Sequence, residues 1–436
     1  MGKSRLSVAT FDLDVTPPVG YRLPYNVEIN KWDLGLRAKG MVLIGAGKPI
    51  VLCALDWIDL SNEGMVLFKK ALATAAGTTP ERVTVHTLHP HDAPGFNPSA
   101  EKIMLEAGLE VDSLFGGMDG SWGRKVIPQL AEAVKKCLQH AHPVDELGLG
   151  KAAVREVASN RTVYRGADGK VIRTRFSSTG TDTLLRKLPE GTIDSIVSVI
   201  SFWNKGNPVA VLSFYATHPQ SYYLTGVANP DFVGVARFFR QLEVPDALHI
   251  HFNGASGDVA AGKYNDGSHI NRLILARRLA DGMKRAWDAT QRQPITASDI
   301  DWWVQPVLLP PHEKIYRLRE KLLAGDTTIS SSYIAEQLAW LKRYEAGITV
   351  DCSCLKMKNS RILFMPGELF VEYQLRAKAM RPDLFVAMSA YGDRGMGYIG
   401  TAEAYRYGGY ETERASKVSS KADAILMEAV RKLLSN

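Results

Sequence analysis

The chain has 436 residues, and its 45% hydrophobic and 23% charged content is typical of a globular protein with a large core. The formal charge of +7 is spread along the chain without a basic block that includes aromatic residues, which excludes nucleic acid as the expected partner. No stretch is long and apolar enough for a membrane span, and no apolar run follows the basic N-terminus, so we expect no signal peptide. Cys352 and Cys354 fit neither a zinc ribbon nor a thioredoxin-like motif, and we interpret the cysteines as reduced thiols of a cytoplasmic protein.

Short apolar runs rich in Val and Ile predict strands. These runs are Gly40–Ile44, Pro49–Leu55, Val83–Leu88, Ile193–Phe202, Val209–Tyr215, Leu248–Phe252, Asp299–Leu309, Arg361–Met365 and Leu384–Ala390. Amphipathic segments predict helices over Asn62–Ala76, Trp122–His140, Pro230–Leu242, Arg272–Thr290, Tyr333–Ala346, Leu369–Met380 and Ser416–Leu434. The mixture indicates an α/β fold, with a mixed β-sheet core flanked by helices. The sequence contains no repeat and no obvious linker, so we expect a single domain over residues 1–436.

Polar residues with useful chemistry follow three of these predicted strands. They are His89 and His91 in T-L-H-P-H-D-A-P-G, His218 in A-T-H-P-Q-S-Y-Y, and Glu368 in M-P-G-E-L-F. Ligand crevices of α/β proteins lie at strand ends, so we expect these side chains to converge. Two histidines, one carboxylate and an open position are sufficient for a catalytic zinc ion. Each residue also has a simpler interpretation, because a turn histidine commonly bonds the backbone and Glu368 could cap the helix that follows it.

The segment H-F-N-G-A-S-G-D-V-A, residues 251–260, follows another predicted strand. It is not a P-loop, and its second glycine comes one position too early for a nucleophile elbow. Its glycines either form a nest of backbone N–H groups for an oxyanion or make only a tight turn, and the sequence leaves both interpretations open.

The ordered set of motifs resembles the catalytic domain of the neutral/alkaline (non-lysosomal) ceramidases. In chain order the motifs are D-V-T-P-P, R-A-K, L-D, L-H-P-H-D-A-P-G, A-T-H-P-Q-S, N-P-D-F-V-G, G-D-V, P-G-E, G-Y-I-G-T-A-E-A-Y and Y-E. The resemblance implies a zinc ion held by His89, His218, Glu368 and Tyr398. It also places His91 near the reacting centre and implies that Arg161 and Tyr405 stabilise negative charge.

Two departures from the family pattern affect the expected substrate. Ala260 stands where the family carries a serine in G-D-V-S-P-N, and the chain lacks the family's secretion signal and C-terminal immunoglobulin-like domain. We therefore expect a substrate other than ceramide. Because a metal-bound water can replace a serine as nucleophile, the missing hydroxyl is compatible with catalysis.

The sequence thus predicts a zinc-dependent hydrolase that uses a metal-bound water to cleave an amide or ester bond in a small molecule. His91 would accept or relay the proton, and Arg161 and Tyr405 would stabilise the oxyanion. Two alternatives stay open: a metal-dependent enzyme acting on a carbohydrate, and a non-catalytic binding protein with a vestigial site. The carbohydrate alternative rests on a cleft lined by His249, His251, Trp203, Tyr222 and Tyr223. The sequence also leaves open whether the protein forms a homo-oligomer.

Overall fold

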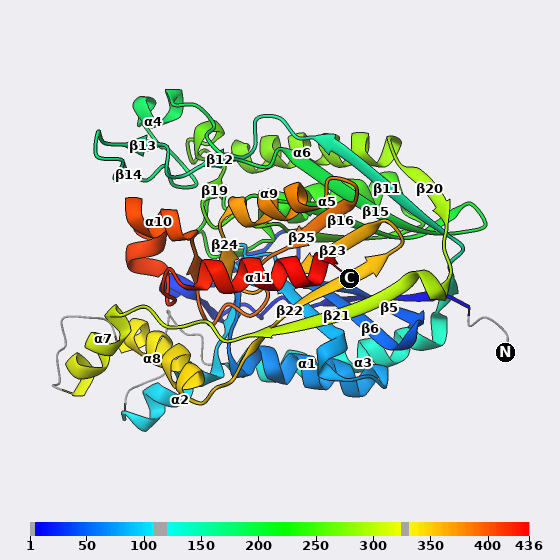
Figure 1. The fold of residues 1–436 in the computed structure, drawn as a ribbon, viewed down its shortest axis with the longest axis horizontal. Coiled ribbons are helices and arrows are strands. Elements are labelled where there is room, and N and C mark those ends of the chain that lie inside the picture. The colour runs from blue at the N-terminus through cyan, green and yellow to red at the C-terminus, as the bar shows by residue number, and fades with distance from the viewer. Residues whose placement is uncertain (1–4, 109–119, 324–330, 436) are drawn as a thin grey trace.

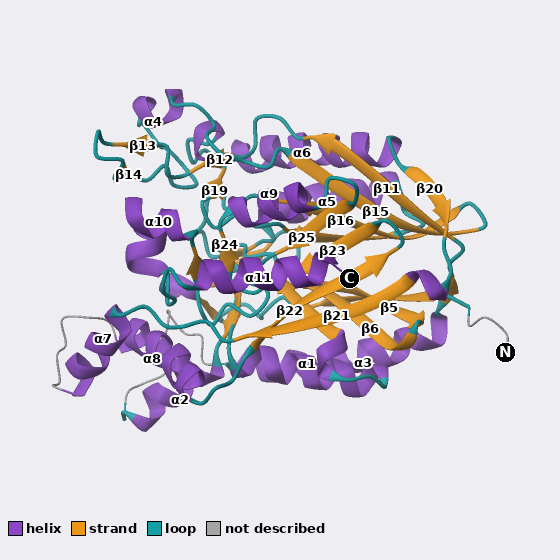
Figure 2. Cartoon of the chain, viewed as in Figure 1, coloured by secondary structure: helices purple, strands orange, loops and turns teal. Residues whose placement is uncertain are grey.

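The computed structural model describes residues 5–108, 120–323 and 331–435, and within them the chain forms three larger β-sheets with helices around them (Figures 1 and 2). The first sheet has the order β10 (His142–Pro143), β1 (Ser7–Asp14), β5 (Arg37–Gly45), β6 (Gly47–Leu55) and β8 (Val83–Thr87). The second has the order β18 (Leu248–Asn253), β16 (Asn207–Tyr215), β15 (Ile196–Asn204), β11 (Glu146–Ala153) and β20 (Gln291–Pro294). The third contains β21 (Ile300–Val307), β22 (Val350–Met357), β23 (Ser360–Phe364) and β25 (Phe385–Ser389). The predicted α/β class with a mixed-sheet core and flanking helices is confirmed.

One order of elements occurs three times within the described residues. Three antiparallel strands are followed by a helix, a fourth strand parallel to the third, and a second helix, with further elements inserted between some of them. The first unit is β1, β5, β6, α1 (Glu63–Ala76), β8 and α3 (Ser121–Cys137). The second unit is β11, β15, β16, α5 (Asp231–Glu243), β18 and α6 (Ile270–Asp288). The third unit is β21, β22, β23, α9 (Val371–Met380), β25 and α11 (Ala422–Ser435).

The carboxyl ends of the three fourth strands meet through a ring of hydrogen bonds. Thr87 N donates to Tyr391 O at 2.9 Å, and Ala390 N donates to Asn253 O at 2.9 Å. Asn253 Nδ2 closes the ring by donating to Leu88 O at 2.6 Å. The ends of β8, β18 and β25 are thereby fixed against one another, and the loops that follow them face a common region.

The first two sheets pack face to face with their helices outside, as Figure 1 shows with α1 and α3 below and α5 and α6 above. Alternation along β6 explains this arrangement, because successive side chains point to opposite faces of a sheet. Ile50 and Leu52 join the core between the sheets, whereas Val51 and Cys53 join the core under α1 and α3. A strand buried on both faces is hydrophobic at every position, which is why this run was recognisable as a strand.

Every predicted strand and helix is present within the described residues, with shifted ends. The last helix begins at Ala422 instead of Ser416, because Ser416 and Val418 form bridges with Gly397 and Pro311. The predicted helix Tyr333–Ala346 is α8 (Ser331–Glu345), and α7 (Lys314–Leu323) precedes it along the chain. In the described part of the chain, no helix has the length and apolar composition of a membrane span.

Candidate metal centre

The backbone at the two metal-ligand histidine candidates is anchored to neighbouring segments of the chain. His89 follows β8 with a φ of 67°, a left-handed conformation that is rare for a residue with a side chain. Its N–H donates to Trp57 O at 2.9 Å, which holds the turn against the end of β6. His218 follows β16, and its N–H donates to Val259 O at 2.9 Å. Both rings are thus carried by backbone that is anchored to a neighbouring segment.

The carboxylate is positioned by a short parallel pair of strands. Glu368 lies in β24 (Glu368–Leu369), directly beside Tyr398 in β26 (Tyr398–Ile399). Gly367 precedes it with a φ of 69°, and a Cβ there would lie 2.8 Å from a side-chain carbon of Ile399. The proline-glycine pair before the carboxylate therefore allows the close approach that brings Glu368 next to Tyr398.

Three potential ligand atoms converge, as the sequence predicted. The Oε2 of Glu368 lies 3.1 Å from the Nε2 of His218 and 3.5 Å from the Nε2 of His89. The three ligand atoms lie within 4.8 Å of one another. The hydroxyl of Tyr398 lies 3.2 Å from His218 Nε2, which adds the fourth predicted ligand. We call His89, His218, Glu368 and Tyr398 the centre; all four are buried.

The hydrogen bonds of the two imidazoles leave their Nε2 atoms without protons. His89 Nδ1 lies 2.6 Å from Ile58 O, and His218 Nδ1 lies 2.7 Å from Ser256 O. A carbonyl oxygen only accepts, so each Nδ1 carries the proton and each Nε2 presents a lone pair. Two lone pairs and a carboxylate oxygen then face one another, and a single tyrosine hydroxyl cannot satisfy all three. A cation would satisfy all of them, so the residues fit a metal ion.

Arg394 fixes the charge of the carboxylate. Its Nη2 pairs with Glu368 Oε1, and its Nη1 lies 3.0 Å from Asp59 Oδ1. Burial would raise the pKa of Glu368, but the charge of Arg394 holds it well below its usual value. Burial, together with the nearby arginines, lowers the pKa of His89 and of His218. An ionised carboxylate and neutral imidazoles are the states in which these groups bind metals.

Arg161 contacts the phenol of the centre. Its Nη1 donates to the Tyr398 hydroxyl at 3.1 Å and lies 3.5 Å from Glu411 Oε1. Burial and the charge of Glu368 raise the pKa of Tyr398, although the charge of Arg161 acts in the opposite direction. The phenol therefore keeps its proton unless a further cation lies beside it.

Two solved structures share this architecture. The chain superposes on the neutral ceramidase from Pseudomonas aeruginosa with a TM-score of 0.72 and 14% identity, covering 99% of this chain and 75% of that one. The chain has the neutral ceramidase fold. A ceramidase complexed with C2 gives a TM-score of 0.70 and 14% identity, with 99% and 76% of the two chains covered. No family model and no curated protein sequence matches the chain. The resemblance inferred from the ordered motifs is confirmed at the level of fold.

His91 lies between the centre and the surface of this neutral ceramidase fold. Its ring centroid is 4.8 Å from that of His89, and its Nδ1 lies 2.9 Å from the Tyr25 hydroxyl and 3.3 Å from Gln220 Nε2. Its Nε2 is buried and has no hydrogen-bond partner among the described residues. The ring of Tyr223 lies 5.1 Å away. His91 is therefore placed next to the centre, as predicted, with one ring nitrogen uncommitted.

The structure does not bring the Tyr405 hydroxyl to the centre. Tyr405 lies in α10 (Ala402–Tyr407), and its hydroxyl lies 2.8 Å from Ser416 Oγ and 2.9 Å from Val418 O. A different tyrosine, Tyr391, packs against the centre instead. Its hydroxyl lies 3.2 Å from His218 Nδ1, and its ring stacks on His89 at a centroid distance of 5.2 Å.

Tyr391 and Arg394 were not identified from the sequence. Both belong to A-Y-G-D-R-G, the segment that follows β25. The position of this segment could have indicated both residues, because His89, His218 and Glu368 were predicted from the same position after a strand.

The glycine-rich segment after β18 is a tight turn that packs against the carboxylate. Val259 N donates to Ser256 O at 3.0 Å, and a Cβ on Gly257 would lie 2.4 Å from Glu368 O. Ala260 lies in β19 (Val259–Ala260) with its side chain fully buried. The turn interpretation explains the glycines, since they allow the backbone to approach Glu368 closely.

The residues predicted to line a carbohydrate cleft come from β15, β18 and the loop after β16, and their ring contacts in the described structure are with residues outside the predicted set. Trp203 stacks on Trp287 at 5.0 Å, and Tyr222 stacks on His269 at 4.1 Å. His251 is buried in β18 with its Nδ1 2.9 Å from Ser213 Oγ. Of the predicted set, only Tyr223 contacts a residue beside the centre in the described structure.

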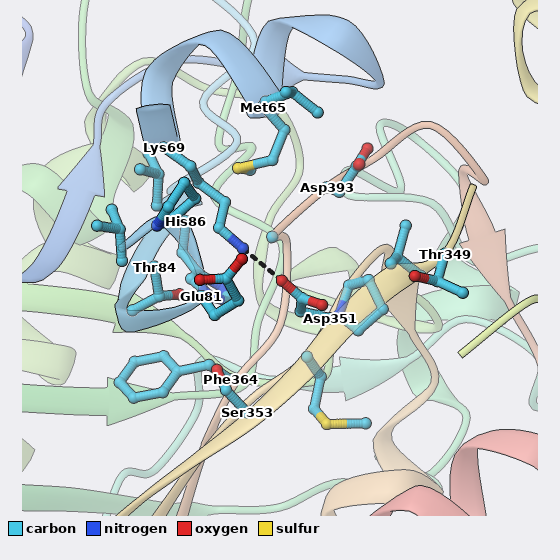
Figure 3. Close-up of a pocket in the computed structure, with 18 of the residues that line it drawn as sticks. Met65, Lys69, Glu81, Thr84, His86, Thr349, Asp351, Ser353, Phe364 and Asp393 are labelled. Atoms are coloured by element: carbon cyan, nitrogen blue, oxygen red, sulfur yellow. Dashed lines mark hydrogen bonds and ion pairs between the residues drawn. The ribbon is translucent and has the colours of Figure 1, made fainter. Parts of the chain in front are cut away.

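A separate cavity of about 280 Å³ lies between α1, β8 and β22 (Figure 3). Lys69 and Asp351 form an ion pair at 2.7 Å within it. His86 of β8 also lines the cavity, and its Nδ1 lies 2.7 Å from Ala390 O. The cavity is therefore distinct from the centre, although it shares strand β8 with it.

Proposed function

We propose that this protein is a zinc-dependent hydrolase that cleaves an amide or ester bond of a small molecule with water. The observation that carries the proposal is the convergence of two Nε2 atoms, whose rings bond backbone carbonyls through Nδ1, on a carboxylate oxygen of Glu368. The fold agrees with it, since both structural neighbours are ceramidases.

His89, His218, Glu368 and Tyr398 are the proposed ligands. Two imidazole nitrogens with carboxylate and phenol oxygens form a donor set that suits zinc. When bound, zinc supplies a Lewis acid that polarises a carbonyl group and makes a water molecule more acidic. The second hydrogen bond of each imidazole, to a backbone carbonyl, fixes the ring in its binding orientation.

Arg161 and His91 are the proposed catalytic residues. The buried guanidinium of Arg161 lies against Tyr398, where it can stabilise negative charge that develops on the substrate oxygen. His91 presents its uncommitted Nε2 beside the His89 ring. The role of Tyr405 stays a prediction, because its hydroxyl would have to leave Ser416 and Val418 to reach the substrate.

The proposed substrate is a small amide or ester other than ceramide. Ala260 places a methyl group where the family pattern has a serine, and its side chain is fully buried. A substrate that depends on contact with that hydroxyl would lose one hydrogen-bonding partner. Hydrolysis by an activated water does not require the hydroxyl.

Metal content provides the first test. Purified wild-type protein should contain zinc in proportion to protein, and His218→Asn should lose it together with hydrolysis of an amide and ester panel. The matched control is His86→Asn, a change in an equally buried histidine that bonds Ala390 O and is not part of the centre. Elemental analysis that finds no metal in the wild type, or equal metal in His218→Asn, would contradict the proposal.

A further inference from the structure

A chain of buried polar side chains connects Arg161 to His91. Arg161 Nη2 lies 3.3 Å from Ser177 Oγ, and Ser177 Oγ in turn bonds Gln220 Oε1. Gln220 Nε2 lies 3.3 Å from His91 Nδ1. Ser177 and Gln220 are both buried.

The donors and acceptors in this chain have one consistent direction. A guanidinium only donates, so the oxygen of Ser177 accepts from Arg161 and its own proton goes to Gln220 Oε1. The amide nitrogen of Gln220 then faces His91, and because it only donates, His91 Nδ1 is an acceptor without a proton. The reversed amide would leave the buried Ser177 hydroxyl without an acceptor among the described residues, which native structures disfavour.

Tyr25 makes a second contact with the same ring nitrogen. Its hydroxyl lies 2.9 Å from His91 Nδ1, and its ring stacks on the imidazole at a centroid distance of 5.8 Å. Tyr25 and Asn26 have φ values of 66° and 62°, two successive left-handed residues with side chains. Such backbone persists only where surrounding contacts impose it, so the turn holds the phenol over His91.

We propose that Ser177, Gln220 and Tyr25 are positioning residues that hold His91 in the tautomer with its proton on Nε2. Its meaning for catalysis rests on the proposed function. The buried Nε2–H, which has no partner among the described residues, is a hydrogen-bond donor beside the centre. In the resting protein His91 is therefore poised to donate through Nε2 to a substrate oxygen, which is the donating half of the accept-or-relay role expected from the sequence.

The tautomer can be measured without any substrate. In protein labelled with ¹⁵N-histidine, long-range ¹H–¹⁵N spectra distinguish protonated from bare ring nitrogens, and loss of signals in His91→Asn assigns the residue. We expect Nε2 to carry the proton and Nδ1 to be bare, with or without added zinc. A proton on Nδ1 would overturn the inference, whereas failure to find metal or hydrolysis would instead affect the proposed function.

Gln220→Glu tests the direction of the hydrogen bonds between Arg161 and His91 with almost no change in side-chain shape. A carboxylate only accepts, so it can keep the Ser177 contact but should draw a proton onto His91 Nδ1. We expect kcat to fall about 10²-fold or more, with unchanged metal content and little change in KM. A Gln220→Glu protein that keeps the Nε2 proton and wild-type kcat would overturn the inference.

Tyr25→Phe is the milder companion variant, because Tyr25 is 52% exposed and its ring can be retained. It removes one of two donors to His91 Nδ1 and leaves Gln220 in place. We expect the same tautomer and a loss of kcat smaller than that of Gln220→Glu. A shift of the proton to Nδ1 in Tyr25→Phe alone would show that Gln220 does not set the tautomer.

Discussion

Single atoms decide what the centre can bind. The carbonyl oxygens of Ile58 and Ser256 set the protons of His89 and His218 on Nδ1, which turns the opposite nitrogens toward Glu368 as lone-pair donors. A metal-binding imidazole usually makes such a hydrogen bond to a backbone carbonyl through its other ring nitrogen. Neither carbonyl has a sequence signature, because any residue could supply it.

Arg394→Met should reveal how strongly the two buried carboxylates depend on the guanidinium that they share. The change leaves Glu368 and Asp59 without their shared partner, and breaking a buried ion pair costs about 3–5 kcal/mol. Urea denaturation should show this loss, and added zinc should recover part of it by binding the folded state. Arg376→Met is the control, since its pair with Asp423 is partly exposed and should contribute about 0–1 kcal/mol. Equal losses in the two variants would contradict this account.

At the scale of elements, the sequence predicted strands where apolar residues are continuous and missed strands where they are not. β6 was recognisable because both of its faces are buried. β11, E-L-G-L-G-K-A-A, was missed because its glycines indicate a turn. The structure supplies the reason for one glycine: a Cβ on Gly150 would lie 2.0 Å from Ala286 O of α6. Close packing of α6 on the second sheet requires glycine there, and this tertiary cause cannot be inferred from the sequence.

Gly150→Ala should therefore destabilise the protein although alanine suits a buried strand. The added methyl meets backbone, which cannot rotate away, and overpacking of this kind typically costs about 1–3 kcal/mol. Ala153→Ser, at the exposed end of the same strand, is the control and should change stability little. Thermal or urea unfolding measures both variants. A Gly150→Ala protein as stable as the wild type would show that α6 does not pack so closely.

At the scale of the whole molecule, all three units contribute to the centre. His89 follows the fourth strand of the first unit, and His218 and Glu368 follow the third strands of the second and third units. A buried pair, Arg237 with Asp56 at 2.6 Å, also joins α5 of the second unit to the end of β6 in the first. The strand ends and the candidate ligands were predictable one by one from the sequence. The topological repeat was not predictable from the sequence, because units with the same strand order can have unrelated side chains.

The most direct test of the central claim is anomalous diffraction at the zinc edge from crystals of the purified protein. The account predicts a peak about 2.0–2.2 Å from the Nε2 atoms of His89 and His218 and from a carboxylate oxygen of Glu368, with the Tyr398 oxygen as the fourth neighbour. A zinc peak at any other place in the molecule, or none among these side chains in protein that contains stoichiometric zinc, would contradict it.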